Sequence, residues 1–303
     1  MTTWADLRVR AERRLRDARV EAPDTEARWM VERVSGYDGV ELVVGEHETA
    51  TAPAIAHLDE MLDRRVAGEP LQYVLGRWQF LGLDLLVDRR VLVPRPETEL
   101  VARLAIDEAA RLGARRGRHD PWSSSSTTSY VVADLGTGSG ALALALASEL
   151  PDAQVWATDV SEDALAVARA NLAGVASAAT RVRLASGSWF AALPDTLRGT
   201  LRVVVTNPPY VAEPEVRDLP AVVADWEPRL ALVSGATGLE AIAAIVEEAP
   251  HWLDPAGGAL VVELAPHLAH RASTLATEVG FTSVTIHPDL AGRDRVLVAR
   301  VAS

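Results

Sequence analysis

The chain has 303 residues, of which 49% are hydrophobic and 24% charged, a composition typical of a globular protein with one ordinary domain and a smaller one. Its net charge of −12 argues against a protein that binds bare nucleic acid by neutralising phosphates. No apolar run approaches the ~20 residues of a membrane span and the start shows no signal-peptide pattern, so we expect no membrane association and a cytoplasmic location.

The residues that most often ligate metals or form disulfides are absent or scattered. Cysteine does not occur, which excludes disulfides, thiol catalysis and cysteine-bound metals. The seven histidines do not pair with carboxylates at the spacings of metal ligands. The sequence therefore predicts no metal site.

Residues 1–76 carry apolar residues at helical spacing. An apolar residue recurs every three or four positions from Trp4, again after Pro23 and again from Ile55 to Val66. Short helices of this kind are not stable alone, so we expect them to pack into a small helical bundle that forms its own domain. Such a bundle would serve as a scaffold or would dock a partner.

Residues 77–93 alternate apolar and polar side chains around the polar turn Asp88-Arg89-Arg90, which predicts a β-hairpin that connects two domains. The prolines of the segment from Pro94 to Glu99 then start a helix that runs through Leu112. Residues 113–129 lack periodicity and are rich in serine, so we expect a mobile surface loop there.

From Tyr130 onward, apolar runs alternate with helical patterns, which predicts a mostly parallel sheet with helices on both faces. The predicted strands are residues 130–135, 154–158, 182–185, 201–206, 259–264, 281–286 and 295–301. The predicted helices are residues 141–150, 163–172, 238–252 and 267–279. Only a short loop joins the last two strands, so we expect them to be antiparallel, because parallel strands need a long crossover. Residues 94–303 would thus form an α/β domain.

A glycine-rich turn follows the first of these strands. It comprises Asp134, Leu135, Gly136, Thr137, Gly138, Ser139 and Gly140. Glycines at this place let a ligand approach the backbone closely. Asp159 ends the second strand, where a carboxylate can hold the two hydroxyls of a ribose. The turn therefore indicates a cofactor that contains a nucleoside.

The glycines alone do not identify the cofactor, because with Ala141 in the last place they also satisfy the dinucleotide pattern of dehydrogenases. Asp134 favours another ligand, since a carboxylate beside the turn suits a cationic amino-acid tail and would repel a pyrophosphate. The turn resembles the nucleotide-binding motif of S-adenosylmethionine-dependent methyltransferases. Trp189, after the third strand, would then lie beside the adenine or else belong to the core.

The fourth strand runs directly into Asn207-Pro208-Pro209-Tyr210. The two prolines end the strand, because neither can donate to a sheet ladder. A planar –NH2 group could donate one hydrogen to Asn207 Oδ1 and the other to the Pro208 carbonyl while it stacks on Tyr210. Acceptors so placed would stabilise positive charge on a nitrogen that attacks an electrophile. The same segment could also be only a rigid loop after a buried strand.

This segment resembles the N-P-P-Y motif of amino methyltransferases, which transfer a methyl group from S-adenosylmethionine to a planar nitrogen. With the helical amino-terminal part, the segment from Pro94 to Glu99, the glycine turn and Glu227-Pro228, it makes nearly the whole chain similar to the protein-(glutamine-N5) methyltransferases. That resemblance implies the Rossmann-like sheet of class I methyltransferases with its last strand antiparallel. It also implies that the small helical bundle docks the substrate.

The resemblance further implies methylation of the side-chain amide of the glutamine in the Gly-Gly-Gln motif of peptide-chain release factors, an event of translation termination. The release factor would be the partner, and no nucleic acid would be a substrate. The catalytic residues would be Asn207, Pro208 and Tyr210. The substrate would be bound by Asn207, Pro208, Pro209 and Tyr210. The cofactor would be bound by Asp134, Gly136, Thr137, Gly138, Ser139, Gly140, Asp159, Trp189 and Asn207.

The chain departs from the family pattern at three places. Ser188 stands where an aspartate commonly precedes the tryptophan, the run after Glu263 lacks an expected glycine, and the loop at 113–129 is long. Three other functions stay open. They are methylation of a glutamine in a ribosomal protein, methylation of adenine N6 in DNA, which the acidic charge disfavours, and non-catalytic binding of S-adenosylmethionine by an adaptor.

Overall fold

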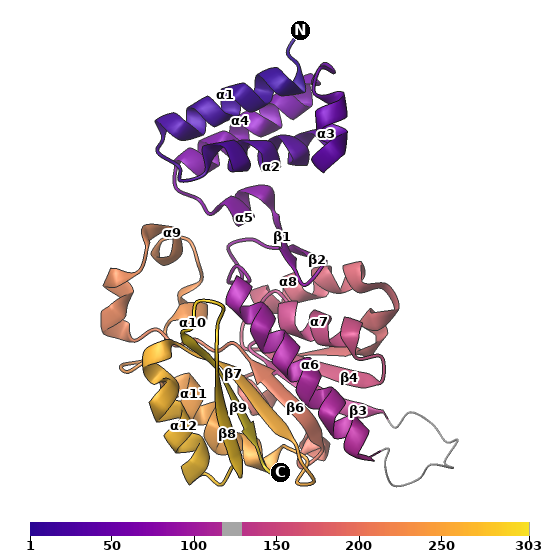
Figure 1. Ribbon diagram of the computed structural model, residues 1–303, viewed down its shortest axis with the longest axis vertical. Coiled ribbons are helices and arrows are strands. Elements are labelled where there is room, and N and C mark those ends of the chain that lie inside the picture. Colours follow the sequence, from indigo (N-terminus) through magenta and orange to yellow (C-terminus); the bar gives the residue numbers. More distant parts are fainter. Residues whose placement is uncertain (117–128, 303) are drawn as a thin grey trace. The chain divides into compact units, whose positions relative to one another are not determined.

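The computed structural model describes residues 1–116 and 129–302, and the chain divides into two compact units (Figure 1). The first unit comprises Met1–Arg77 and Pro220–Trp226, and the second comprises Trp78–Leu219 and Glu227–Ser303. In the described ranges, no helix is both long and apolar enough to cross a membrane.

The first unit is helical. Its helices are α1 (Trp4–Asp17), α2 (Pro23–Ser35), α3 (Gly39–Gly45), α4 (Ala52–Val66), α5 (Leu71–Leu75) and α9 (Ala221–Ala224). The Thr3 hydroxyl caps α1, and Gly36 ends α2 in the left-handed conformation that glycine adopts without strain. Leu7, Met30 and Leu58 are fully buried and belong to three different helices. The three predicted helices are confirmed, whereas α3, α5 and α9 were not predicted.

The hairpin between helices and sheet differs from its prediction. Strands β1 (Arg77–Phe80) and β2 (Leu83–Leu86) turn at Leu81 and Gly82, which both have positive φ. The prediction of a hairpin turn around Asp88 is wrong. Residues 87–95 instead form an irregular segment that leads to the next helix.

The second unit contains a sheet which, in the described residues, has seven strands in the order β5-β4-β3-β6-β7-β9-β8. Its strands are β3 (Tyr130–Leu135), β4 (Ala153–Asp159), β5 (Val182–Ser186), β6 (Leu201–Thr206), β7 (Ala259–Glu263), β8 (Ser283–Pro288) and β9 (Asp294–Arg300). Strand β9 is antiparallel to both of its neighbours, and the other pairings are parallel. The predicted strands and the antiparallel last pair are confirmed.

Helices cover both faces of this sheet (Figure 1). They are α6 (Pro96–Arg116), α7 (Ala141–Glu149), α8 (Glu162–Leu172), α11 (Glu240–Glu248) and α12 (Ala269–Glu278), and the short helix α10 (Arg229–Leu232) precedes α11 without buried residues of its own. The 3-10 helices are η2 (Ala173–Arg181), η3 (Trp189–Ala192), η4 (Asp195–Leu197), η5 (Glu213–Asp218), η6 (Ala249–His251) and η7 (Pro266–Leu268). Helix α6 extends beyond its predicted end at Leu112, so the first part of the predicted loop is helical. The remainder of that loop lies almost wholly outside the described residues.

Strand β6 shows why the sheet is buried on both sides. Val203 and Val205 pack into the core beneath α6 and α7, while Val204 packs into the core beneath α11 and α12. Because successive side chains of a strand point to opposite faces, a strand covered twice must be apolar throughout. The apolar run Val203–Val205 in β6 is thus explained, and the chain continues from it to Asn207 at the sheet edge.

Candidate functional site

A cavity of about 730 Å³ opens where β3, β4 and β6 end. The chain passes from β3 to β4 on one side and returns to β6 on the other, so these strand ends flank the point where the strand order reverses. Open α/β sheets bind ligands in the crevice at such a point. All residues that line the cavity belong to the second unit.

The glycine turn forms one wall of this cavity. Gly136, Gly138 and Gly140 all have positive φ, which glycine adopts without steric cost. A Cβ on Gly136 would lie 3.1 Å from the Trp189 ring. The backbone N–H groups of Gly136 and Thr137 both donate to the Thr158 carbonyl of β4, at 2.8 Å each. The turn is therefore fixed against β4, and at Gly136 it presents only backbone.

Asp134 has a different environment from the one predicted for it. Its side chain is fully buried and is not among the residues that line the cavity. The Thr137 hydroxyl donates to Asp134 Oδ2 at 2.6 Å, and the Ala143 N–H donates to the same oxygen at 3.1 Å. Burial raises the pKa of Asp134 to about 7. The carboxyl group thus fastens the turn to α7 through Oδ2, and the expected contact of Asp134 with a cationic ligand tail stays a prediction.

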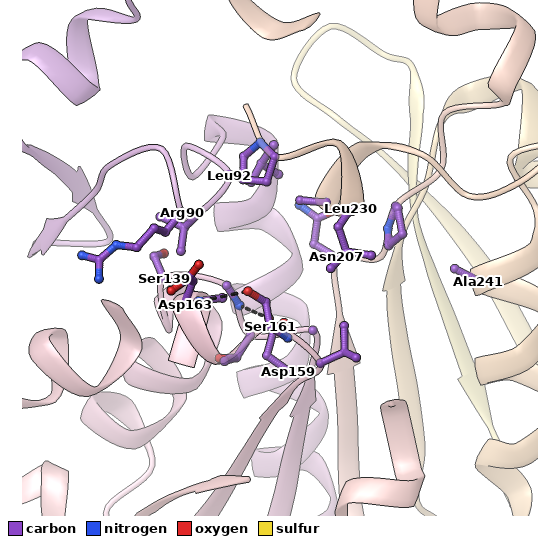
Figure 2. A pocket seen from close by; sticks show the side chains of 18 of the residues that line it. Arg90, Leu92, Ser139, Asp159, Ser161, Asp163, Asn207, Leu230 and Ala241 are labelled. Carbon is purple, nitrogen blue, oxygen red and sulfur yellow. Dashed lines mark hydrogen bonds between the residues drawn. The ribbon is translucent and has the colours of Figure 1, made fainter. Parts of the chain in front are cut away.

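Asp159 lies in the wall of the cavity, at the end of β4 (Figure 2). Its Oδ2 accepts from the Gly138 N–H at 2.8 Å, and its Oδ1 accepts from the Ser161 N–H at 2.9 Å. Burial raises the pKa of Asp159. Each carboxylate oxygen has a further lone pair, so Asp159 can accept hydrogen bonds from two ligand hydroxyls while it holds the glycine turn.

Trp189 lines the cavity and also packs on the core beneath α11 and α12. Its φ of 46° is unusual for a bulky residue, and such strain is found mainly where the surroundings impose it. The indole ring lies over Gly136, and the Thr158 hydroxyl donates to the Trp189 carbonyl at 3.4 Å. Trp189 thus belongs to both of the predicted environments, the cavity wall and the core.

The segment after β6 forms another wall. In the close view, Asn207 lies on a different side of the cavity from Ser161 and Asp163 (Figure 2). Asn207 Nδ2 donates to the Thr98 hydroxyl at 3.2 Å. Pro209 also lines the cavity, whereas Pro208 is buried and is not among the lining residues.

Tyr210 lies behind this wall and is not among the lining residues either. Its ring packs on the core beneath α11 and α12, and its hydroxyl donates to Glu263 Oε1 at 3.4 Å. Burial raises the pKa of Tyr210 further above its ordinary value. The cavity therefore joins the glycine turn, Asp159, Trp189 and Asn207, while Asp134, Gly140 and Tyr210 support it from outside. Pro208 is buried between two lining residues, Asn207 and Pro209.

Sequence reasoning missed several residues of this region. Thr98 lines the cavity and Glu263 lies directly behind it, yet the sequence around Thr98 indicated only a helix start. One signal was present, because Glu263 is a carboxylate at the end of an otherwise apolar strand next to β6. Arg95 and Glu227 belong to two segments that carried the family resemblance, and the ion pair at 2.6 Å between them was not predicted.

Comparison with known proteins gives full-length relatives. The chain matches the family descriptions "PrmC N-terminal domain" over residues 6–76 and "Methyltransferase small domain" over residues 123–223. The release factor glutamine methyltransferase of Deinococcus radiodurans is 37% identical over 98% of this chain and 98% of its own length. That of Streptomyces coelicolor is 38% identical over 97% of this chain and 96% of its own length.

A solved structure shares the fold at low identity. The catalytic domain of human METTL16 matches with a TM-score of 0.55 and 13% identity, over 89% of this chain and 87% of that one. At this identity the match concerns the fold alone, and it agrees with the sheet order and the antiparallel last strands described above.

Proposed function

Because this chain belongs to the release factor glutamine methyltransferase family, we propose that it methylates the glutamine side-chain amide in the Gly-Gly-Gln motif of a peptide-chain release factor. The chain is an S-adenosylmethionine-dependent methyltransferase of class I fold. The observation that carries the substrate assignment is the meeting of Asn207 with the glycine turn and Asp159 in one cavity. Release factors act in the cytoplasm, which is where we place the protein.

The cavity suits S-adenosylmethionine, which supplies an electrophilic methyl group when bound. The glycine turn offers bare backbone, and a side chain on Gly136 would meet Trp189. Asp159 has lone pairs for the ribose hydroxyls, and Trp189 offers an aromatic face for the adenine. We assign cofactor binding to these residues, to Thr137, Gly138 and Ser139, and to Asn207.

The protein's own contribution to the chemistry is to hold the amide nitrogen of the substrate in place. Asn207 Oδ1 and the Pro208 carbonyl would accept one hydrogen each from the glutamine –NH2 group, which aligns the nitrogen and excludes larger groups. Amide nitrogens are poor nucleophiles, and two acceptors stabilise the positive charge that develops during attack. Tyr210 supports this segment from behind.

We assign substrate docking to residues 1–76, joined by the connector at residues 77–93 to the catalytic domain at residues 94–303. Residues 6–76 match the family's amino-terminal domain, and none of them lines the cofactor cavity. A separate helical unit is free to bind the body of a protein substrate while the cavity receives a single side chain.

The test is a transfer assay with labelled S-adenosylmethionine. The purified enzyme is incubated with a release factor, with the same factor whose Gly-Gly-Gln glutamine is changed to alanine, with ribosomal proteins, and with duplex DNA. We expect label only in the intact release factor, and mass spectrometry should place one methyl group on that glutamine. Label in ribosomal proteins or DNA alone would reject the substrate but keep the chemistry, and cofactor binding without any transfer would indicate an adaptor.

A further inference from the structure

A chain of hydrogen bonds runs behind the cavity wall from β7 to Asn207. Glu263 ends β7, beside β6, and is only 1% exposed. The Thr98 hydroxyl, in the first turn of α6, donates to Glu263 Oε2 at 2.7 Å. Asn207 Nδ2 in turn donates to the Thr98 oxygen at 3.2 Å. Three segments that are distant in sequence thus meet at the side chain that faces the substrate.

The direction of these bonds follows from counting hydrogens. A hydroxyl has one hydrogen to donate, and an ionised carboxylate can only accept. When Glu263 is ionised, Thr98 therefore directs its hydrogen to Glu263, which leaves only lone pairs toward Asn207. Asn207 must then present its –NH2 end to Thr98. Its carbonyl oxygen, Oδ1, is left for the cavity.

The direction matters because the two ends of a carboxamide have opposite hydrogen-bonding character. With Oδ1 in the cavity, Asn207 accepts from the –NH2 group of a substrate amide. With the Asn207 carboxamide rotated by half a turn, its –NH2 group would face the –NH2 group of the substrate. Hydrogens would then meet hydrogens, and the contact would be repulsive. A neutral partner in place of the carboxylate would permit both orientations, since the Thr98 hydroxyl could then turn and donate to Oδ1.

Other groups surround Glu263 and hold it in place. The Tyr210 hydroxyl donates to its second oxygen, Oε1, at 3.4 Å. Arg295 of β9 places a positive charge near the carboxylate, and Glu97 of α6 places a negative one there. The carboxylate is therefore buried between two hydroxyl donors, next to a compensating guanidinium group.

We propose that Glu263 and Thr98 are positioning residues that fix which end of the Asn207 carboxamide faces the substrate. The inference rests on the proposed function in one respect, that the group to be methylated is a planar –NH2. It goes beyond that function because neither residue touches the reacting nitrogen, and both act through Asn207.

The sequence offers a direct way to observe this orientation. The chain contains two asparagines, Asn171 and Asn207, so [15N]asparagine labelling yields two side-chain amide signals in an NMR spectrum. Asn171 donates to the carbonyls of Leu86 and Ser139 and serves as the internal control. We expect the Asn207 amide protons of the wild type to show the shift and slowed solvent exchange of a hydrogen-bonded group.

Substitution of Thr98 and Glu263 should alter only the Asn207 signal. In Thr98→Val the signal should move toward that of a solvent-exposed amide, and in the matched control Thr98→Ser it should stay near its wild-type position. Glu263→Gln can either accept from or donate to Thr98, so the Asn207 signal should double or broaden. The inference is overturned if Thr98→Val and Glu263→Gln both leave the Asn207 signal where it is in the wild type.

Kinetics provide the second readout. Thr98→Val should lower kcat roughly 10- to 100-fold, the scale of a misplaced catalytic contact, while Kd for S-adenosylmethionine changes little. Thr98→Ser should restore most of kcat. The effect of Thr98→Val should nearly vanish when Asn207→Ala is already present, because Thr98 acts through Asn207.

An equal loss in both backgrounds, or an unchanged kcat in Thr98→Val, would refute the positioning role. A wild-type enzyme that does not methylate a release factor would refute the proposed substrate instead. In that event the NMR comparison of the variants still decides whether Glu263 and Thr98 orient Asn207, because it needs no substrate.

Discussion

At the scale of single residues, we propose that Asn207 is the group on which the reaction depends most directly. Its –NH2 end donates to Thr98, which leaves its carbonyl oxygen for the substrate in the proposed arrangement. We expect Asn207→Ala to cost about 3 kcal/mol of transition-state stabilisation, which corresponds to a fall in kcat of roughly 150-fold. Single-turnover methylation measures this loss, and titration with S-adenosylmethionine measures cofactor affinity. A loss of affinity as large as the loss of rate would show that Asn207 serves binding alone.

We expect Glu263 to make the reaction sensitive to pH. Burial raises the pKa of Glu263 to about 7, with Arg295 opposing the rise and Glu97 adding to it. When protonated, Glu263 can donate to Thr98, which then can donate to Asn207 Oδ1 and reverse the amide. We therefore expect kcat to rise as the pH increases through about 7, and we expect kcat of Glu263→Gln not to show this rise. If Glu263→Gln shows the same rise, another titrating group is responsible for it.

The same ionisation has a consequence for stability. The ordinary pKa of the group is 4.5, so the native state binds a proton between about 4.5 and about 7 that the unfolded state has released. The contribution of Glu263 to the free energy of unfolding is thus largest below pH 4.5 and falls as the pH rises to about 7. Glu263→Gln should gain in stability relative to the wild type over this window, as urea unfolding at pH 5 and pH 8 can measure. A difference that does not vary with pH would contradict this assignment.

The site residues separate into those that sequence could identify and those that it could not. Asn207 and Asp159 follow strands directly, and their place at the sheet edge is a consequence of that order. The face toward which the Asp134 side chain points follows from the alternation of side chains along a strand. Val132 faces the core beneath α7, and Asp134, two residues on, faces the same way. Thr98 could not be identified, because its partner Glu263 is 165 residues away.

At the scale of elements, the irregular segment before α6 is fastened to the segment before α10 by a buried ion pair. Arg95 donates to Glu227 at 2.6 Å, and the Glu227 side chain is only 2% exposed. Removal of one partner leaves a buried charge without compensation, which typically costs about 3–5 kcal/mol. Arg95→Met should therefore lower the free energy of unfolding by about 3 kcal/mol and weaken cofactor binding, because Pro94 and Pro228 both line the cavity.

A nearby exposed pair serves as the control for this prediction. Arg229 and Glu213 form an ion pair in which both side chains are more than half exposed. Exposed pairs contribute about 0–1 kcal/mol, so Arg229→Met should change the free energy of unfolding by no more than that. Urea unfolding of both variants gives the comparison. Equal losses would mean that burial of Glu227 does not determine the effect of Arg95.

The elements themselves differ in how well sequence predicts them. Strand β6 carries the apolar run Val203–Val205 and is followed by two prolines, so both its type and its end were predicted. The short helices α3 and α5 were missed because each spans fewer than two full helical turns. A helix of that length is too short to show a repeating apolar pattern. The hairpin turn at Leu81 and Gly82 was missed because leucine rarely adopts a positive φ.

At the scale of the whole molecule, the division into units could be predicted only in part. The change from helical to alternating patterns near residue 77 marks the end of the first run of helices. Pro220–Trp226 also belongs to the first unit, although the chain on either side of it belongs to the second. Such a grouping arises from packing between segments far apart in sequence, and no local pattern reports it.

The first unit presents an apolar surface that suits a protein partner. Val40, Val43 and Val44 of α3 are 78%, 67% and 81% exposed. Three exposed valines on one short helix form a patch, whereas single exposed apolar residues are common and need no function. If the first unit docks the release factor, a charge in this patch should raise KM for the release factor. The cofactor cavity, which is lined by the second unit alone, should be unaffected.

Val44→Asp and Val9→Asp test this assignment as a matched pair. Val9 of α1 is also well exposed, at 62%, but lies on a different helix. We expect Val44→Asp to raise KM for the release factor about 10-fold, the size of a contact worth about 1.4 kcal/mol, with Kd for S-adenosylmethionine unchanged. Val9→Asp should leave both constants near wild type. Because both changes add one negative charge to the same unit, equal effects would assign the loss to the protein's net charge and not to the patch on α3.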